Sequence, residues 1–135
     1  MANENLLDDW AECMIKNPFE HVKITTHNTP EDLHKPGVKD DKGKPPVGLV
    51  FESFPRALLA IADVAGMGAK KYTRGGWQTV ENGDTRYTDA MGRHILNKYI
   101  DGHNDPESEL PHLAHAAWNA LAVLELYLRE NTEHD

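Results

Sequence analysis

The stretch Leu110–Leu128, LPHLAHAAWNALAVLELYL, decides the fold. Its only polar side chains before Glu125 are His112, His115 and Asn119. Because an α-helix turns by about 100° per residue, spacings of three and four place these three groups on one stripe. The other positions are mostly alanine, leucine, valine and tryptophan, and a helix that is apolar nearly all round is normally buried. Buried polar groups need partners, which a metal ion or a ligand could provide.

The composition of the chain limits its class. At 135 residues and 15.2 kDa it is long enough for one domain with one core. A formal net charge of −8 argues against general nucleic-acid binding and against binding to anionic membranes. A single cysteine, Cys13, excludes an internal disulfide and suggests a reducing compartment. With no visible signal peptide and no long apolar run, a cytoplasmic location is expected, which is the host cytoplasm if a phage encodes the chain.

Helical periodicity outside the opening stretch predicts an all-α fold. A helix that begins near Ser53 and one that begins near Asp84 or Thr85 carry apolar residues at helical spacing. A short amphipathic helix near the N-terminus precedes a polar, proline-containing loop, in which HVKITTH could form a short strand. We therefore expect two long antiparallel helices, one packed helix and a short N-terminal helix, completed by oligomerisation. The predicted organisation is one domain, 1–135, with an N-terminal helix at 1–18, a long polar loop at 19–46 and a helical core at 47–130.

A cationic segment follows the second predicted helix. The sequence GAKKYTRGGW places Lys70, Lys71 and Arg74 beside a glycine turn and the aromatic residues Tyr72 and Trp77. In an acidic protein, this cluster is the best candidate for an anion-binding site. Positive charge near a helix C-terminus also complements the helix dipole, and the two interpretations have similar weight.

A second polar stripe runs along the third predicted helix, where Arg86, Asp89 and Arg93 are three and four residues apart. This stripe is either an exposed ion-pair face or the wall of a site opposite the histidines of the final helix. In the second case, carboxylates and imidazoles on adjacent helices could converge on a metal ion. His112-x-x-His115 taken alone is a weak signal, since a histidine pair satisfied in a core or an interface is equally compatible with it.

Several motifs, taken in order, resemble the N-terminal domain family of phage dATP/dGTP diphosphohydrolases. The resemblance covers residues 42–128 and leaves out the first forty. The motifs that carry it are KPP at 44–46, GAKKY at 68–72, Trp77, RYTDAMGRH at 86–94 and DPESELPHLAHAAWNAL at 105–121.

The resemblance implies a relative of the all-α MazG-like nucleotide pyrophosphohydrolases. Those enzymes cleave nucleoside triphosphates to monophosphate and pyrophosphate with Mg²⁺ or Mn²⁺, and they work as dimers or tetramers. It therefore implies a purine nucleoside triphosphate ligand, a divalent metal and a homodimer or homotetramer. By position, the metal ligands would be Asp89, His112, His115 and Asn119, and the catalytic groups Asp89, His115 and Glu107. Phosphates would be bound by Lys71, Arg86 and Arg93 with Lys70 and Arg74 of the cationic segment, and Lys44 could close over them.

The sequence departs from the MazG pattern at its final helix, which offers histidines and an asparagine where that pattern has clustered acids. Asp105 and Glu107 in the preceding loop could supply the carboxylates, or the site could prefer a softer metal such as manganese or zinc. Two further hypotheses remain open. One is a protein that binds or sequesters a nucleotide without cleaving it, and the other is a structural helical module whose histidine stripe is an oligomer interface.

Overall fold

A computed structural model describes residues 34–132 of the protein. Its regular elements are helical, which confirms the all-α prediction for this part of the chain. They are α2 (Val47–Ser53), α3 (Pro55–Lys71), the 3-10 helix η2 (Gly76–Thr79), α4 (Gly83–Asp101) and α5 (His112–Thr132). The predicted N-terminal helix and the possible strand HVKITTH lie outside the described residues.

The chain divides into two compact units, Met1–Val47 and Gly48–Asp135. In the first unit, the described residues form turns, one of them closed by a hydrogen bond of 3.1 Å from the Lys44 amide to the Asp41 carbonyl. The ammonium of Lys44 donates to the carbonyl of Asp40 in the same turn. The second unit contains nearly all the helices and begins one residue after the predicted start of the helical core.

The start of the helical core differs in detail from the prediction. One helix was expected to begin near Ser53, but the structure has two, since α2 precedes α3 and only Phe54 lies between them. Pro55 occupies the first turn of α3, where its missing N–H leaves no helical hydrogen bond unmade. Gly66 and Gly68 were expected to weaken this helix, yet it continues to Lys71, because an interior glycine costs only about 1 kcal/mol relative to alanine.

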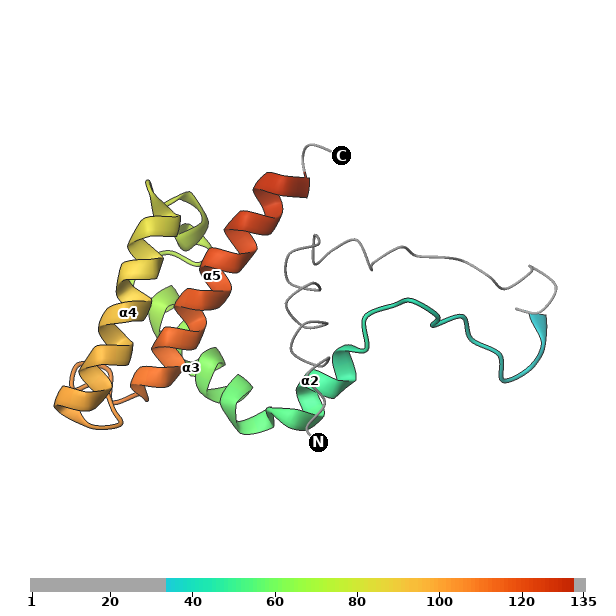
Figure 1. Cartoon of the computed structure of the whole chain (residues 1–135), viewed down its shortest axis with the longest axis horizontal. Coiled ribbons are helices and arrows are strands. Elements are labelled where there is room, and N and C mark those ends of the chain that lie inside the picture. The colour runs from blue at the N-terminus through green and yellow to red at the C-terminus, as the bar shows by residue number, and fades with distance from the viewer. Residues whose placement is uncertain (1–33, 133–135) are drawn as a thin grey trace, which may run out of the picture. The chain divides into compact units, whose positions relative to one another are not determined.

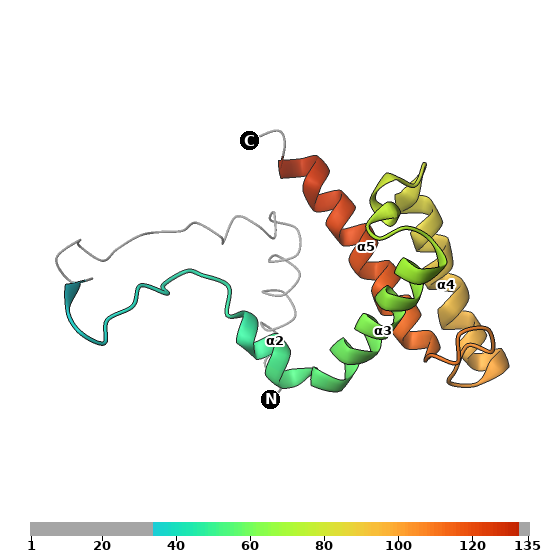
Figure 2. The same cartoon turned by 180° about the vertical axis from the view of Figure 1, so that it is seen from behind.

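Helices α4 and α5 form an antiparallel pair, and α3 packs against α5 (Figures 1 and 2). The buried apolar side chains of the described residues are small: Val64, Ala114, Ala116 and Ala122. Small side chains let helix axes approach closely. At the start of α4, a Cβ on the buried Gly83 would lie 3.3 Å from a side-chain atom of α5. The sequence therefore specifies a tightly packed pair of long helices with a thin core.

Three aromatic rings join η2, α4 and α5. The ring of Trp118 is edge-on to Trp77, with centroids 5.9 Å apart, and to Tyr87, with centroids 5.7 Å apart. The Tyr87 hydroxyl donates a hydrogen bond of 2.7 Å to the Trp77 carbonyl. Trp77 and Trp118 also line an apolar groove of about 520 Å³ between α3 and α5. This aromatic cluster fixes the loop that follows α3 onto the helical pair.

Many large apolar side chains of the second unit remain at least half exposed. On α4 and α5 they include Leu96, Tyr99, Ile100, Leu113, Leu121, Leu124 and Tyr127. Exposed apolar surface of this extent on paired helices is typical of a chain that associates with another surface. Within the described part of the chain, no helix is both long enough and apolar enough to cross a membrane.

Candidate metal centre

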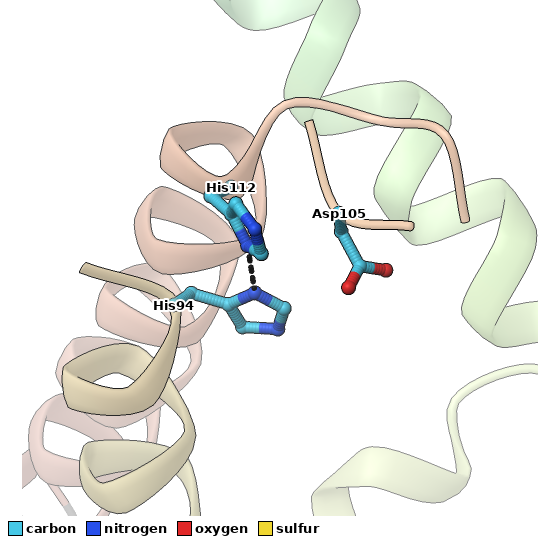
Figure 3. Close-up of side chains that lie close together, drawn as sticks. All are labelled: His94, Asp105 and His112. Atoms are coloured by element: carbon cyan, nitrogen blue, oxygen red, sulfur yellow. Dashed lines mark hydrogen bonds between the residues drawn. The ribbon is translucent and has the colours of Figure 1, made fainter. Parts of the chain in front are cut away.

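Two histidines and one aspartate converge where α4 and α5 are joined. His94 comes from α4, Asp105 from the connecting loop and His112 from the first position of α5 (Figure 3). One donor atom from each residue lies within 4.8 Å of the other two. His112 is fully buried, and the other two are half-buried. Among the described residues, these three form the group that could hold a metal ion.

The two imidazoles face each other through the same type of nitrogen. His94 Nδ1 and His112 Nδ1 are 3.0 Å apart, as the dashed line in Figure 3 marks. Two nitrogens bound at about 2.1 Å to one metal ion are about 3.0–3.4 Å apart, so this spacing fits a shared ion. It also fits a hydrogen bond in which one ring donates and the other accepts. The pair is thus placed to hold either a proton or a metal ion.

The other nitrogen of His112 has no hydrogen-bond partner. His112 Nε2 is the buried side-chain nitrogen or oxygen that stays unpaired in the described part of the chain. Asp101 Oδ2 lies 3.3 Å from it, within ion-pair range but outside hydrogen-bonding geometry. A buried, unpaired polar atom costs about 1–3 kcal/mol. A metal ion on Nδ1 would fix the proton on Nε2, and a small rotation of Asp101 would then satisfy it.

Asp105 is held as a carboxylate by the loop around it. Its Oδ2 atom accepts hydrogen bonds from the Ser108 amide at 2.9 Å and from the Ser108 hydroxyl at 2.8 Å. Burial works against ionisation of Asp105, but the Ser108 hydrogen bonds, with His115 and His94 nearby, more than offset it and lower the pKa of this carboxyl. The carboxylate is therefore charged at neutral pH.

Hydrogen bonding around Ser108 also fixes the tautomer of His115. The Ser108 hydroxyl gives its one proton to Asp105 and accepts from the Leu110 amide at 3.2 Å. His115 Nε2 lies 2.7 Å from the same oxygen, so Nε2 must carry the proton and donate it. The lone pair of His115 is therefore on Nδ1. The ring of His115 stacks on that of His94 at 4.4 Å and 8°.

Both imidazoles of this stack favour the neutral form. The pKa of His94 is lowered by burial, and the neighbouring His115 adds to the effect. The pKa of His115 is lowered chiefly by burial, although the carboxylate of Asp105 works in the opposite direction. Neutral imidazole is the form that binds metals and accepts protons, so the site is ready for either role at neutral pH.

These shifts predict that the metal-free protein loses stability in weak acid. A histidine whose pKa is lowered in the folded state takes up its proton more readily once unfolded. The contribution of these two neutral rings to stability is therefore present above the unfolded pKa of about 6.5. It is lost as the pH falls through the lowered folded-state pKa values of His94 and His115. Urea unfolding in EDTA at pH 7.5 and 5.5 measures the change.

The control for this pH dependence is the exposed His103. His115→Gln should reduce the loss of stability between the two pH values, whereas His103→Gln should leave it unchanged. Equal stability of the parent protein at pH 7.5 and 5.5 would show that the buried rings are not the groups that titrate.

The stripe of Arg86, Asp89 and Arg93 does not form the second wall of this centre. All three side chains are exposed on α4, and the histidine next to the stripe, His94, takes the inward position. At about 100° per residue, the five residues from Asp89 to His94 correspond to about 140° around the helix. The group that could hold a metal ion thus contains the carboxylate of Asp105 and not that of Asp89, and the role predicted for the stripe stays a prediction.

The other residues proposed from the sequence lie in four places. Lys71 Nζ is 2.6 Å from Glu107 Oε1, which joins the end of α3 to the loop that carries Asp105, and this partner raises the pKa of Lys71. Asn119 is buried, but its amide donates to the His115 carbonyl one turn earlier. Lys70 and Arg74 are exposed near the end of α3, and Lys44 belongs to the first unit.

Sequence reasoning left three residues of the centre unassigned: His94, Asp101 and Ser108. A signal for the first two exists, since a separation of seven residues places His94 and Asp101 on one face of α4. No comparable periodic signal marks Ser108, because its contacts depend on the loop conformation. That conformation includes a positive φ of 61° at Glu109.

Comparisons with known proteins bear on the same region. The family model described as dATP/dGTP diphosphohydrolase, N-terminal, matches residues 34–135. The chain is also similar to a protein of Salmonella phage PMBT28 named dATP/dGTP diphosphohydrolase, with 34% identity over 99 residues. That alignment covers 73% of this chain but 32% of the phage protein, so the chain spans about a third of its relative's length. No solved structure matches this chain.

Proposed function

This chain belongs to the dATP/dGTP diphosphohydrolase N-terminal family, and on that basis we propose that it hydrolyses a purine deoxynucleoside triphosphate. The products are the monophosphate and pyrophosphate, and the reaction depends on a divalent metal, Mg²⁺ or Mn²⁺ in the first instance. The observation that carries the proposal is the convergence of His94, Asp105 and His112 on one point. Nucleotide hydrolysis at neutral pH needs electrophilic assistance at phosphate, and this is the place in the described chain that could hold it.

The donor set fits a divalent cation. Asp105 is a carboxylate at neutral pH, the pKa of His94 is lowered so that its ring is neutral, and His112 presents Nδ1 to the same point. When bound, a divalent ion would polarise a phosphate oxygen and lower the pKa of a water molecule. Three protein ligands leave coordination positions for both.

His115 is our candidate for the group that accepts a proton from the attacking water. Its Nε2–H is held by Ser108 at 2.7 Å, so Nδ1 keeps the lone pair that accepts a proton from water. Burial lowers the pKa of this ring, so the ring is neutral at the start of the reaction. We therefore assign His115 as the general base, with Ser108 and Asp105 fixing its tautomer.

Phosphate charge would be met at the rim of the centre by Lys71, whose ammonium is paired with Glu107. Their ion pair is exposed and only two residues from Asp105, so an incoming triphosphate could displace Glu107 and take its place beside the ammonium. The exposed cations Lys70, Arg74, Arg86 and Arg93 supply further positive charge on the same unit.

One observation favours a second candidate, a domain that binds the nucleotide without cleaving it. The phage relative is about three times as long as the aligned region, so its named activity could belong to the part that this chain does not match. In that case the metal centre would hold the triphosphate, and hydrolysis would need another domain.

The test is hydrolysis by the purified full chain. dATP, dGTP, dCTP and dTTP are each incubated with Mg²⁺ or Mn²⁺, and the products are separated by ion-exchange chromatography. Release of pyrophosphate from the purine nucleotides, abolished by EDTA and by His115→Ala, supports the enzyme. Equilibrium binding of the same nucleotides without product supports the second candidate, and neither binding nor turnover overturns both.

We also propose that the chain forms a homodimer or homotetramer. The exposed apolar residues of α4 and α5, such as Leu96, Tyr99 and Leu124, support this, because a symmetric interface is the commonest way to cover such a surface. Light scattering on the purified chain measures the mass. A monomer at micromolar concentration would contradict the proposal.

A further inference from the structure

We infer that the centre formed by His94, Asp105 and His112 selects a transition-metal ion over Mg²⁺, and that Asp101 is the outer-sphere carboxylate that orients His112. The inference rests on the proposed function only in placing a divalent ion at these three residues. It adds the class of ion, and it adds Asp101 as a positioning residue that acts through the metal ligand His112.

Selection of a transition-metal ion over Mg²⁺ follows first from the donor atoms. Two of the three are imidazole nitrogens, His94 Nδ1 and His112 Nδ1, 3.0 Å apart. Mg²⁺ prefers six oxygen ligands and keeps several of its waters, whereas imidazole suits manganese, iron, cobalt, nickel and zinc. Asp105 is the single carboxylate of the group, so a magnesium ion would find one preferred protein ligand there. Two histidines and one carboxylate are a set that transition metals use with open positions for substrate.

Burial strengthens the selection. His112 has no exposed surface, and His94 and Asp105 are half-buried, so an ion bound here must give up water on the side of His112. Mg²⁺ dehydrates reluctantly, which makes that exchange unfavourable.

The position of Asp101 supports its role in orienting His112. It lies seven residues after His94 on α4, on the same face, and its Oδ2 atom is 3.3 Å from His112 Nε2. That nitrogen has no hydrogen-bond partner. A histidine that binds a metal through one nitrogen almost always donates the other N–H to a carboxylate, carbonyl or water. The misaligned pair is thus an outer-sphere contact that closes when His112 takes up an ion.

The experiment measures metal binding by the full chain, independently of turnover. Protein stripped with EDTA and dialysed is titrated with Zn²⁺, Mn²⁺ and Mg²⁺ by competition with a chelating dye, and its Tm is recorded with each ion. We expect Zn²⁺ to bind at least about 100-fold more tightly than Mg²⁺ and to raise the Tm, with Mn²⁺ between them. Equal affinities for Zn²⁺ and Mg²⁺ would overturn the inference. So would a His94→Gln variant that binds Zn²⁺ with the parent affinity.

Asp101 is tested with a spectroscopic probe. Asp101→Asn should lower Zn²⁺ affinity by about 10–100-fold and change the visible absorption of the Co²⁺-substituted protein, while Asp101→Glu should restore part of both. Asp63→Asn, an exposed change on α3, is the matched control and should alter neither. An unchanged Co²⁺ spectrum in Asp101→Asn would remove this residue from the outer sphere. Selective Zn²⁺ binding without nucleotide hydrolysis would defeat the proposed function alone, and hydrolysis with no preference among ions would defeat this inference alone.

Discussion

Replacing Asp105 with asparagine is expected to lower the turnover of a purine deoxynucleoside triphosphate by more than about 100-fold, because outer-sphere changes alone typically cost 10–100-fold. The substitution removes the charged ligand of the metal group but keeps an oxygen that can accept both hydrogen bonds from Ser108. The loop should therefore keep its conformation while the ion is lost. Steady-state turnover at saturating metal, measured beside the Tm in EDTA, separates the two effects.

Two further aspartates make this experiment decisive. Asp89→Asn tests the expectation drawn from the sequence, and the exposed position of Asp89 on α4 predicts a much smaller loss than for Asp105→Asn. Asp63→Asn changes an exposed carboxylate on α3 and should leave turnover at the parent value. If Asp89→Asn were the more damaging substitution, the catalytic ion would lie on the outer stripe of α4 and the assignment of Asp105 would be wrong.

The fold could be predicted from periodicity, since Leu110–Leu128 and the segment from Asp84 to Ile100 carry long helical patterns with clear turn signals between them. The antiparallel packing of these helices agrees with the general rule that consecutive helices joined by a short connection pack side by side. The short helix α2 was missed, because VGLVFES is apolar without a clear period and a proline follows it. A pattern of seven residues cannot separate a helical turn from a strand.

The site could be predicted only in part, for a geometric reason. His112 and His115 stand out as polar residues on an apolar helix; His112 belongs to the centre, and the ring of His115 stacks on that of His94. The facing residue of α4 depends on the rotation of that helix about its axis, which packing sets and local sequence does not. Charge drew attention to Asp89, whereas His94, one position away from Arg93, faces inward. A rotation of about 140° about the helix axis is enough to exchange Asp89 for His94.

Trp118→Ala is expected to lower the free energy of unfolding by about 2–4 kcal/mol, less than a fully buried tryptophan costs because the ring is only half-buried. The ring contacts Trp77 and Tyr87 edge-on, and each such pair contributes about 0.5–1.5 kcal/mol beyond burial. The buried apolar side chains of the described core are three alanines and one valine, so few other contacts can compensate. Urea unfolding followed by far-ultraviolet circular dichroism gives the change.

Control substitutions show whether the aromatic cluster is the cause. Tyr99→Ala removes a ring that is 80% exposed on α4 and should cost less than about 0.5 kcal/mol in the monomer, while Trp118→Phe should retain about half of the lost stability. Because Trp118 lies one turn after His115 and outside the metal group, the folded variant should still bind Zn²⁺ with the parent affinity. A Trp118→Ala protein as stable as the parent would mean that η2 is held to the helical pair by other contacts. Loss of Zn²⁺ affinity in the folded variant would mean that this cluster also sets the position of the histidines.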